Sequence, residues 1–114
     1  MNAEVRELPL FPLNAVLFPG GPMPLRIFEP RYLEMVSRCM REQTGFAVVL
    51  LGEGEEATAA TSFAATGTEA RIVDFDRLED GLLGISCLGR ERVRVVEAWR
   101  EAGGLNLGRV LDVA

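Results

Sequence analysis

The stretch PLRIFEPRY, residues 24–32, joins a strand pattern directly to a helix pattern. Leu25 and Ile27 alternate with Arg26, as on a strand whose two faces differ. Pro30 suits the first position of a helix, because an N–H at that position would have no partner within the helix. The stretch therefore predicts a strand that turns into a helix within a few residues.

The charged residues of this corner favour a structural role. Glu29 stands at the helix start, where the helix dipole favours a negative side chain. A charge among apolar residues is normally paired, so we expect Arg26 or Arg31 to pair with Glu29. We assign Arg26, Glu29, Pro30 and Arg31 to the structure of the corner, and Tyr32 to the start of the apolar face of the helix.

Upstream of the corner, the segment ELPLFPLNAVLFPGG (residues 7–21) is apolar and interrupted by prolines. Proline cannot donate a hydrogen bond to a neighbouring strand, so it is usually confined to the edges of sheets. We therefore expect two short edge segments, residues 8–13 and 16–18. PGGP at residues 19–22 is a strong turn signal.

Downstream, apolar residues recur at helical spacing as far as Glu42, and Gly45 is expected to end the helix. Such a stripe packs against the core of a folded domain. The residues expected on it are Tyr32, Leu33, Val36, Cys39 and Met40.

The rest of the chain is predicted to form strands around this helix, with a mobile loop of small and acidic residues at 52–62. One early helix among five or six strands predicts an α+β fold with a closed or half-closed antiparallel sheet. The final strand is apolar, so we expect a second copy of the chain or another part of the molecule to cover it. The strands expected are 45–51, 63–75 with a bulge near Gly67, 82–100 as one strand or two broken at Gly89, and 105–113.

Two residue types that serve much of enzyme chemistry are missing. The chain has no histidine, and all 12 of its basic residues are arginine. Without histidine there is no Ser-His or Cys-His nucleophile, and zinc loses its usual nitrogen ligand. Without lysine there is no Schiff base and no phosphate-binding GxxxxGK[ST] loop. We therefore expect no catalytic residues, no metal site and no cofactor.

The charge balance argues against nucleic acid as a general partner. The net charge is −5, whereas non-specific nucleic-acid binding depends on basic charge. Arg90, Arg92 and Arg94 share one face of a predicted strand and leave a local basic patch open as an alternative. Cys39 and Cys87 form no CxxC pair and are expected to be reduced and buried, as in a cytoplasmic protein.

The spaced motifs LPLFPL, LFPG, PLRIFEPRY, a mid-chain GT and a late G-x-x-R closely resemble the amino-terminal substrate-binding domain of Lon proteases, especially small bacterial proteins that carry this domain alone. The resemblance covers nearly the whole chain. It implies a PUA-like six-stranded antiparallel pseudo-barrel with one α-helix after the second or third strand. Residues 1–114 then correspond to the barrel lobe, and the helical bundle that follows it in the family is absent from this chain.

The resemblance implies a cytoplasmic, non-catalytic module that contacts polypeptides, without the ATPase and protease parts of Lon. The Lon-like domain of cereblon also makes protein contacts. On the residues themselves, Phe18, Pro19 and Met23 are expected to present an apolar patch to an extended segment, unless they pack the end of the barrel. The edge LPLFPL would add a strand from such a segment.

Three other functions stay open. They are a PUA-like nucleic-acid-binding domain that uses Arg90, Arg92 and Arg94, an assembly module that forms a homodimer through an exposed edge or the terminal strand, and a small enzyme, which the residue inventory favours least.

Overall fold

A computed structural model describes residues 4–51 and 63–113 of this chain, so the loop predicted at residues 52–62 lies outside the described residues. Within these ranges the chain forms six strands and one helix. In chain order they are β1 (Arg6–Leu13), β2 (Pro22–Ile27), α1 (Pro30–Glu42), β3 (Phe46–Leu51), β4 (Phe63–Arg77), β5 (Leu83–Arg100) and β6 (Asn106–Val113).

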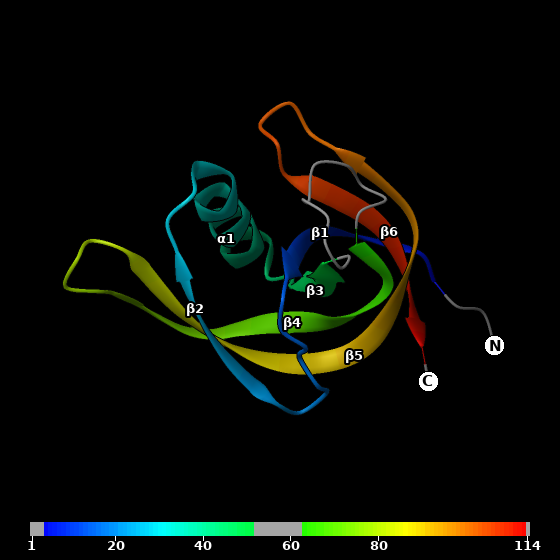
Figure 1. The fold of residues 1–114 in the computed structure, drawn as a ribbon, viewed down its shortest axis with the longest axis horizontal. Helices are drawn as coiled ribbons and strands as arrows, with labels where there is room; N and C mark the ends of the chain where they lie inside the picture. Colours follow the sequence, from blue (N-terminus) through cyan, green and yellow to red (C-terminus); the bar gives the residue numbers. More distant parts are fainter. Residues whose placement is uncertain (1–3, 52–62, 114) are drawn as a thin grey trace.

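Five of the strands close into a barrel (Figure 1). The sheet order is β2-β5-β4-β3-β1-β6, and β6 also pairs with β5, which joins the two ends of the five-stranded run. Among the described residues, the sixth strand, β2, pairs with β5 alone, and the edge that it leaves open there carries Pro22 and Pro24. We call residues 22–27, 71–77 and 83–88 the wing, because there three strands extend beyond the barrel.

The pseudo-barrel with one helix after the second strand confirms the predicted fold class, but the prediction of a purely antiparallel sheet was wrong. β1 and β3 are parallel, with Leu10 opposite Ala47 and Leu13 opposite Leu50. Parallel neighbours need a long crossover connection. Here β2 and α1 supply it, because both lie between β1 and β3 in the chain.

The prediction of an edge position for LPLFPL was also wrong. β1 lies between β3 and β6, so Pro9 and Pro12 occupy an interior strand, and residues 16–18 form no strand. Each proline removes one ladder hydrogen bond, worth about 1 kcal/mol. Burial of Leu8, Leu10 and Phe11 contributes about 1.5–3 kcal/mol for each side chain, which outweighs that loss.

The terminal strand is covered by other parts of the molecule, which is one of the arrangements expected for it. β6 pairs with β1 from Arg6 to Leu10 on one side and with β5 from Arg92 to Arg100 on the other. The end of the described chain therefore closes the barrel.

β5 is one continuous strand of 18 residues, which confirms the first of the two predicted alternatives, without a break at Gly89. Its register with β4 shifts between Thr68 and Ala70, just after the bulge predicted near Gly67, and again between Ile72 and Asp74. Such irregularities bend a strand. The bends allow the first half of β5, residues 83–88, to lie in the wing and the second half, residues 92–100, to lie in the barrel.

Helix α1 begins with Pro30 at its first turn, as predicted, but it ends earlier than Gly45. Gln43 caps its C-terminus in the left-handed conformation (φ 56°), and the cap N–H bonds to the carbonyl of Cys39. Gly45 serves close packing instead, since a Cβ there would clash with the carbonyl of Ala70. Within the described ranges, no helix is long and apolar enough to cross a bilayer.

The helix contributes a narrower stripe to the core than the sequence predicted. Leu33 and Met40 are exposed, while Met35, which the prediction left out, is fully buried. The side chains of α1 that are buried are Tyr32, Met35, Val36 and Cys39.

The core consists of two clusters. The larger lies between α1 and the sheet, and it contains a tilted aromatic pair, Phe11 and Tyr32, whose ring centroids are 4.3 Å apart. The smaller lies within the barrel and consists of Leu8, Leu10, Ala47, Val49, Val93 and Val110. The two clusters lie on opposite faces of β1 and β3, because successive side chains of a strand alternate.

One ion-pair network links strands that are distant in the chain. Glu69 on β4, whose side chain is only 6% exposed, accepts a hydrogen bond from Arg6 Nη2 on β1 at 3.0 Å. The same nitrogen donates to Asp112 on β6 at 2.6 Å, and Arg71 Nε lies 3.8 Å from the Glu69 carboxylate. The network therefore ties β1, β4 and β6 together.

We predict that Glu69→Ala lowers the free energy of unfolding by about 1–3 kcal/mol, because Arg6 and Arg71 lose a charged acceptor. Urea denaturation followed by the fluorescence of Trp99 measures the change. The matched control is Glu97→Ala, whose partner Arg109 lies 3.5 Å away with both side chains about 60% exposed, and it should cost less than about 1 kcal/mol. Equal losses in the two variants would contradict a special role for Glu69.

Candidate functional site

The turn before β2 holds an aromatic side chain in solvent. Gly21 N–H donates to the carbonyl of Phe18 at 2.8 Å, and Gly20 has φ +81°, which defines a type II turn with Pro19 at its second position. The Phe18 side chain is 61% exposed and Pro19 is exposed. Met23 differs, because it is half-buried and packs against the larger core cluster. The turn therefore brings Phe18 and Pro19 to the surface but not Met23.

This turn is fixed to the sheet by its backbone. Gly20 N–H donates to the carbonyl of Gly89 at 2.9 Å, and Gly89 N–H donates to the carbonyl of Gly21 at 2.8 Å. A Cβ on Gly89 would clash with the carbonyl of Phe18, so only glycine permits the approach. Thr68 Oγ1 donates to the buried carbonyl of Leu17 at 2.7 Å and holds the segment that leads into the turn.

At the corner after β2, Arg31 is the arginine that meets Glu29. Its Nε donates to Glu29 Oε1 at 3.1 Å, its Nη1 donates to the carbonyl of Gly104 at 3.1 Å, and its guanidinium lies 4.7 Å from the Tyr32 ring centroid. Arg26 points elsewhere and lies 3.9 Å from Asp80. Arg31 thus fastens the start of α1 to the β5–β6 turn.

Two hollows lie beside β2. The smaller, about 320 Å3, is at the corner between the ends of β1 and β2 and the start of α1, and Phe28 and Tyr32 are among its lining residues. The larger, about 510 Å3, is in the wing, and we call it the trough. Its lining residues are Pro24, Leu25, Arg26, Asp74, Phe75, Asp76, Leu78, Gly84, Ile85 and Ser86.

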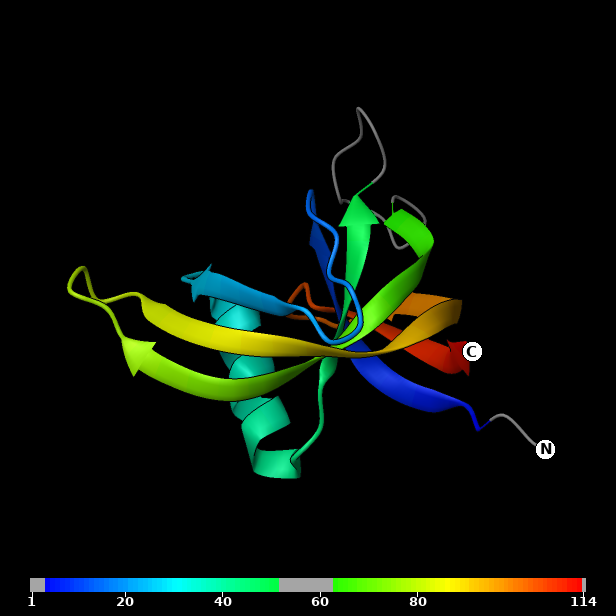
Figure 2. The same ribbon diagram turned by 90° about the horizontal axis from the view of Figure 1, so that it is seen from below.

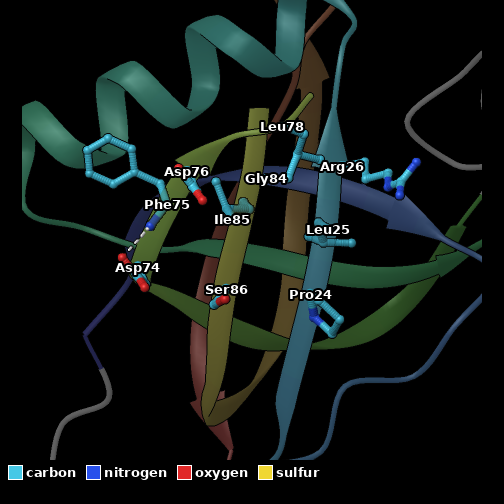
Figure 3. A pocket seen from close by; sticks show the side chains of 10 residues that line it. All are labelled: Pro24, Leu25, Arg26, Asp74, Phe75, Asp76, Leu78, Gly84, Ile85 and Ser86. Atoms are coloured by element: carbon cyan, nitrogen blue, oxygen red, sulfur yellow. Dashed lines mark hydrogen bonds between the residues drawn. The ribbon is translucent and has the colours of Figure 1, made fainter. Parts of the chain in front are cut away.

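Helix α1 lies on one face of the wing (Figure 2). Ile85 is buried in the cluster beneath α1, so its neighbours Gly84 and Ser86 face the other way, and the trough opens on that other face (Figure 3). Figure 3 shows the carboxylates of Asp74 and Asp76 on the β4 side, with β5 between them and β2. The arrangement offers small side chains on the floor and charges on the rim.

The cysteines lie away from both hollows and are poor nucleophiles. Burial raises the pKa of each thiol, Cys39 and Cys87, from 9.0 to about 11. Both therefore stay protonated at neutral pH. Among residues 4–51 and 63–113, no three His, Cys, Asp or Glu side chains gather into a group that could hold a metal ion.

The sequence predicted the turn at residues 19–22 and the corner at residues 26–31, but it did not predict the trough. Its signal lies in the segment LGISC, residues 83–87, where Gly84 and Ser86 alternate with larger apolar residues. Alternation of this kind shows that one face of a strand lacks bulk. The carboxylates of β4 could not be placed beside that face, because the pairing of β4 with β5 depends on register shifts.

Comparison with known domains gives the following likenesses. Residues 7–113 match the family model described as the ATP-dependent protease La (LON) substrate-binding domain. The crystal structure of a Lon N-terminal domain protein from Xanthomonas campestris shares 43% identity with a TM-score of 0.81, over 92% of this chain and 58% of that one. The N-terminal domain of the Mycobacterium avium complex Lon protease has a similar fold, with a TM-score of 0.68 at 13% identity over 96% of this chain and 55% of that one.

Two longer proteins are also similar in sequence. Lon protease 2 of Myxococcus xanthus is 33% identical over 97 residues, which cover 83% of this chain and 12% of that protein. Protein cereblon of Danio rerio is 31% identical over 111 residues, which cover 94% of this chain and 25% of that protein. The chain therefore spans a small part of these relatives and little more than half of the two solved chains.

We predict that the two contacts at the ends of β2 differ in importance. Gly89→Ala should lower the free energy of unfolding by about 2–3 kcal/mol, because the new Cβ displaces the Phe18 turn. Glu29→Ala should cost less than about 1 kcal/mol, because both partners of that ion pair reach solvent. Urea denaturation measures both. Gly103→Ala is the control, since a Cβ there meets nothing within 4 Å, and a Gly89→Ala protein as stable as this control would refute the contact.

We predict that stability falls as the pH rises from about 9 to about 11. The folded thiols, with pKa values of about 11, hold protons that unfolded thiols with the ordinary value of 9.0 release. Their contribution is therefore complete below pH 9 and is lost as the pH approaches 11. Urea denaturation across this range should show a shallower decline for a Cys39→Ala/Cys87→Ala variant than for the parent. Parallel declines would show that burial does not shift the thiols.

Proposed function

The chain belongs to the LON substrate-binding domain family, and from this membership we propose that it is a non-catalytic module that binds segments of other polypeptides. The family model matches residues 7–113, so the likeness involves nearly the whole chain. The substrates of a protease are polypeptides, which gives the class of ligand. The sequence supports a role without catalysis, because it has neither histidine nor lysine.

The observation that carries the proposal is the exposed Phe18 on a fixed turn. An exposed aromatic ring on a mobile loop loses conformational entropy when it binds. Here the hydrogen bonds to Gly89 hold the backbone of the turn before any ligand arrives. Aromatic anchors presented in this way contribute much of the binding energy in protein interfaces. Phe18 and the adjacent Pro19 are therefore the proposed contact, and Met23 supports them from the core.

Further apolar side chains are exposed near this turn. Val16 precedes it in the chain, and Leu88 lies opposite Pro22 on β5, next to Gly89. Exposed apolar side chains that gather on one surface often mark a site of interaction. The binding mode would be contact through side chains, because β1 has strand neighbours on both sides and cannot accept an added strand.

A basic patch supports nucleic acid as the second candidate ligand. Arg90, Arg92 and Arg94 are all exposed on β5, and within the described residues none has an acidic partner within ion-pair distance. The net charge of −5 opposes this function. Binding of a labelled oligonucleotide that weakens steeply with salt would favour it over polypeptide binding.

We predict that Phe18→Ala weakens binding of a reduced, carboxymethylated and fluorescently labelled protein roughly fivefold or more, without lowering the melting temperature. Fluorescence anisotropy titration measures the affinity. Met40→Ala, which truncates an exposed apolar side chain on α1, is the control and should bind as the parent does. Met23→Ala should lower the melting temperature as well, because its side chain packs on the core. Unchanged affinity and stability in Phe18→Ala and Met23→Ala would place the site elsewhere.

A further inference from the structure

The floor of the trough follows from strand register. Ser86 on β5 lies between Pro24 on β2 and Asp74 on β4, and Gly84 lies between Arg26 and Asp76 in the same way. Residues directly opposite one another in paired strands project to the same face of the sheet. The middle strand therefore carries the small side chains and its two neighbours carry the larger ones.

The trough has the width of one extended chain. Neighbouring strands are about 4.8 Å apart, so the rims on β2 and β4, which lie on either side of β5, are separated by roughly 10 Å. Stacked sheets lie about 10 Å apart as well, which is the room that an extended chain needs to pack on a strand. The trough's volume of about 510 Å3 lies within the range of about 300–1,000 Å3 typical of ligand sites. A Cβ on Gly84 would lie 3.0 Å from Leu78 Cδ2, so Leu78 packs over the floor at the hairpin end.

The two rims of the trough differ in charge. On β2, Arg26 lies 3.9 Å from Asp80, which offsets its charge. On β4, Asp74 and Asp76 are exposed, and no arginine of residues 4–51 and 63–113 lies within ion-pair distance of either. Asp74 Oδ1 accepts a hydrogen bond of 2.9 Å from the backbone N–H of Phe75, which is a neutral donor. The β4 rim therefore presents two carboxylates without cationic partners.

We propose that the trough binds an extended polypeptide segment in which lysine or arginine stands next to an apolar residue. The apolar side chain lies over Ser86, between Pro24 and Leu78, while the cation reaches Asp74 and Asp76. Successive side chains of an extended chain point to opposite sides, so the cation next to the floor residue starts out pointing away from the floor. The long, flexible side chain of lysine or arginine then bends over the edge of the segment to reach the β4 rim. This inference rests on the proposed polypeptide binding and names its substrate class.

The trough also leads toward the exposed aromatic residue. From Ser86 it is three residues, or roughly 10 Å, along β5 to Gly89, where the Phe18 turn is bound. Leu88 is exposed on the way. One extended segment of a few residues is therefore long enough to occupy the trough and meet Phe18.

The test uses two short fluorescein-labelled peptides that share their leucine and glycine positions. The remaining positions carry lysine in one peptide and glutamate in the other. The lysine peptide should bind more tightly, and its affinity should fall with salt. Asp74→Asn/Asp76→Asn should lower that affinity roughly threefold to tenfold and remove the preference, while asparagine at 74 still accepts the N–H of Phe75.

A second variant tests the place of binding. Ser86→Trp fills the trough at an exposed position and should abolish binding of the lysine peptide. Ser37→Trp is the matched control, because it makes the same change at an exposed position of α1, away from the trough, and should bind as the parent does. Unchanged melting temperatures show that both variants are folded.

The outcomes separate this inference from the function it rests on. If the carboxymethylated protein binds but the two peptides bind equally, or Ser86→Trp has no effect, the trough is not the selective site and polypeptide binding stands. If neither the peptides nor the carboxymethylated protein bind, the proposed function itself fails.

Discussion

The sharing of β5 among three neighbours is the constraint on which the rest of the structure depends. Its first residues, 83–88, pair with β2, and its last, 92–100, pair with β6. Between these two partners a short gap remains, and the backbone of Gly20 and Gly21 fills it through hydrogen bonds to Gly89. The same strand therefore closes the barrel, supports the wing and fixes the turn that carries the exposed aromatic residue.

Local sequence patterns predicted where the helix and strands lie better than they predicted which strands pair with one another. Pro30 marked the helix start, and the alternation around Arg26 marked β2, because both signals act within a few residues. Pro9 and Pro12 led to the wrong prediction of an edge strand. The rule that excludes proline from interior strands considers the lost hydrogen bond but not the burial of the neighbouring leucines. The parallel pairing of β1 with β3 depends on β2 and α1 filling the crossover, which no local pattern records.

The candidate site divides in the same way. The exposure of Phe18 follows from a Pro-Gly turn that the sequence shows directly. The ion-pair partner of each charged residue does not follow from the local sequence, because an arginine side chain can reach any of several carboxylates. Arg38 pairs with Glu101 through two hydrogen bonds of 3.0 and 3.1 Å across 63 positions of sequence. Among the described residues no arginine lies within ion-pair distance of Asp74 or Asp76, and this charge of the trough emerges only when the strands are in register.

The two prolines on the open edge of β2 limit how this edge can pair with a strand of another chain. Gly89 donates to Gly21, so alternation along the antiparallel pair turns the backbone N–H and C=O groups of Met23 and Leu25 toward β5. The ring nitrogens of Pro22 and Pro24 therefore face outward. An outward nitrogen without hydrogen cannot bond to an arriving chain, and unfolded chains seek such edges. A domain that gathers unfolded segments beside a bare edge would nucleate cross-β aggregates. With two prolines on this edge, the proposed binding of an extended chain would rest on side-chain contacts and would stay reversible.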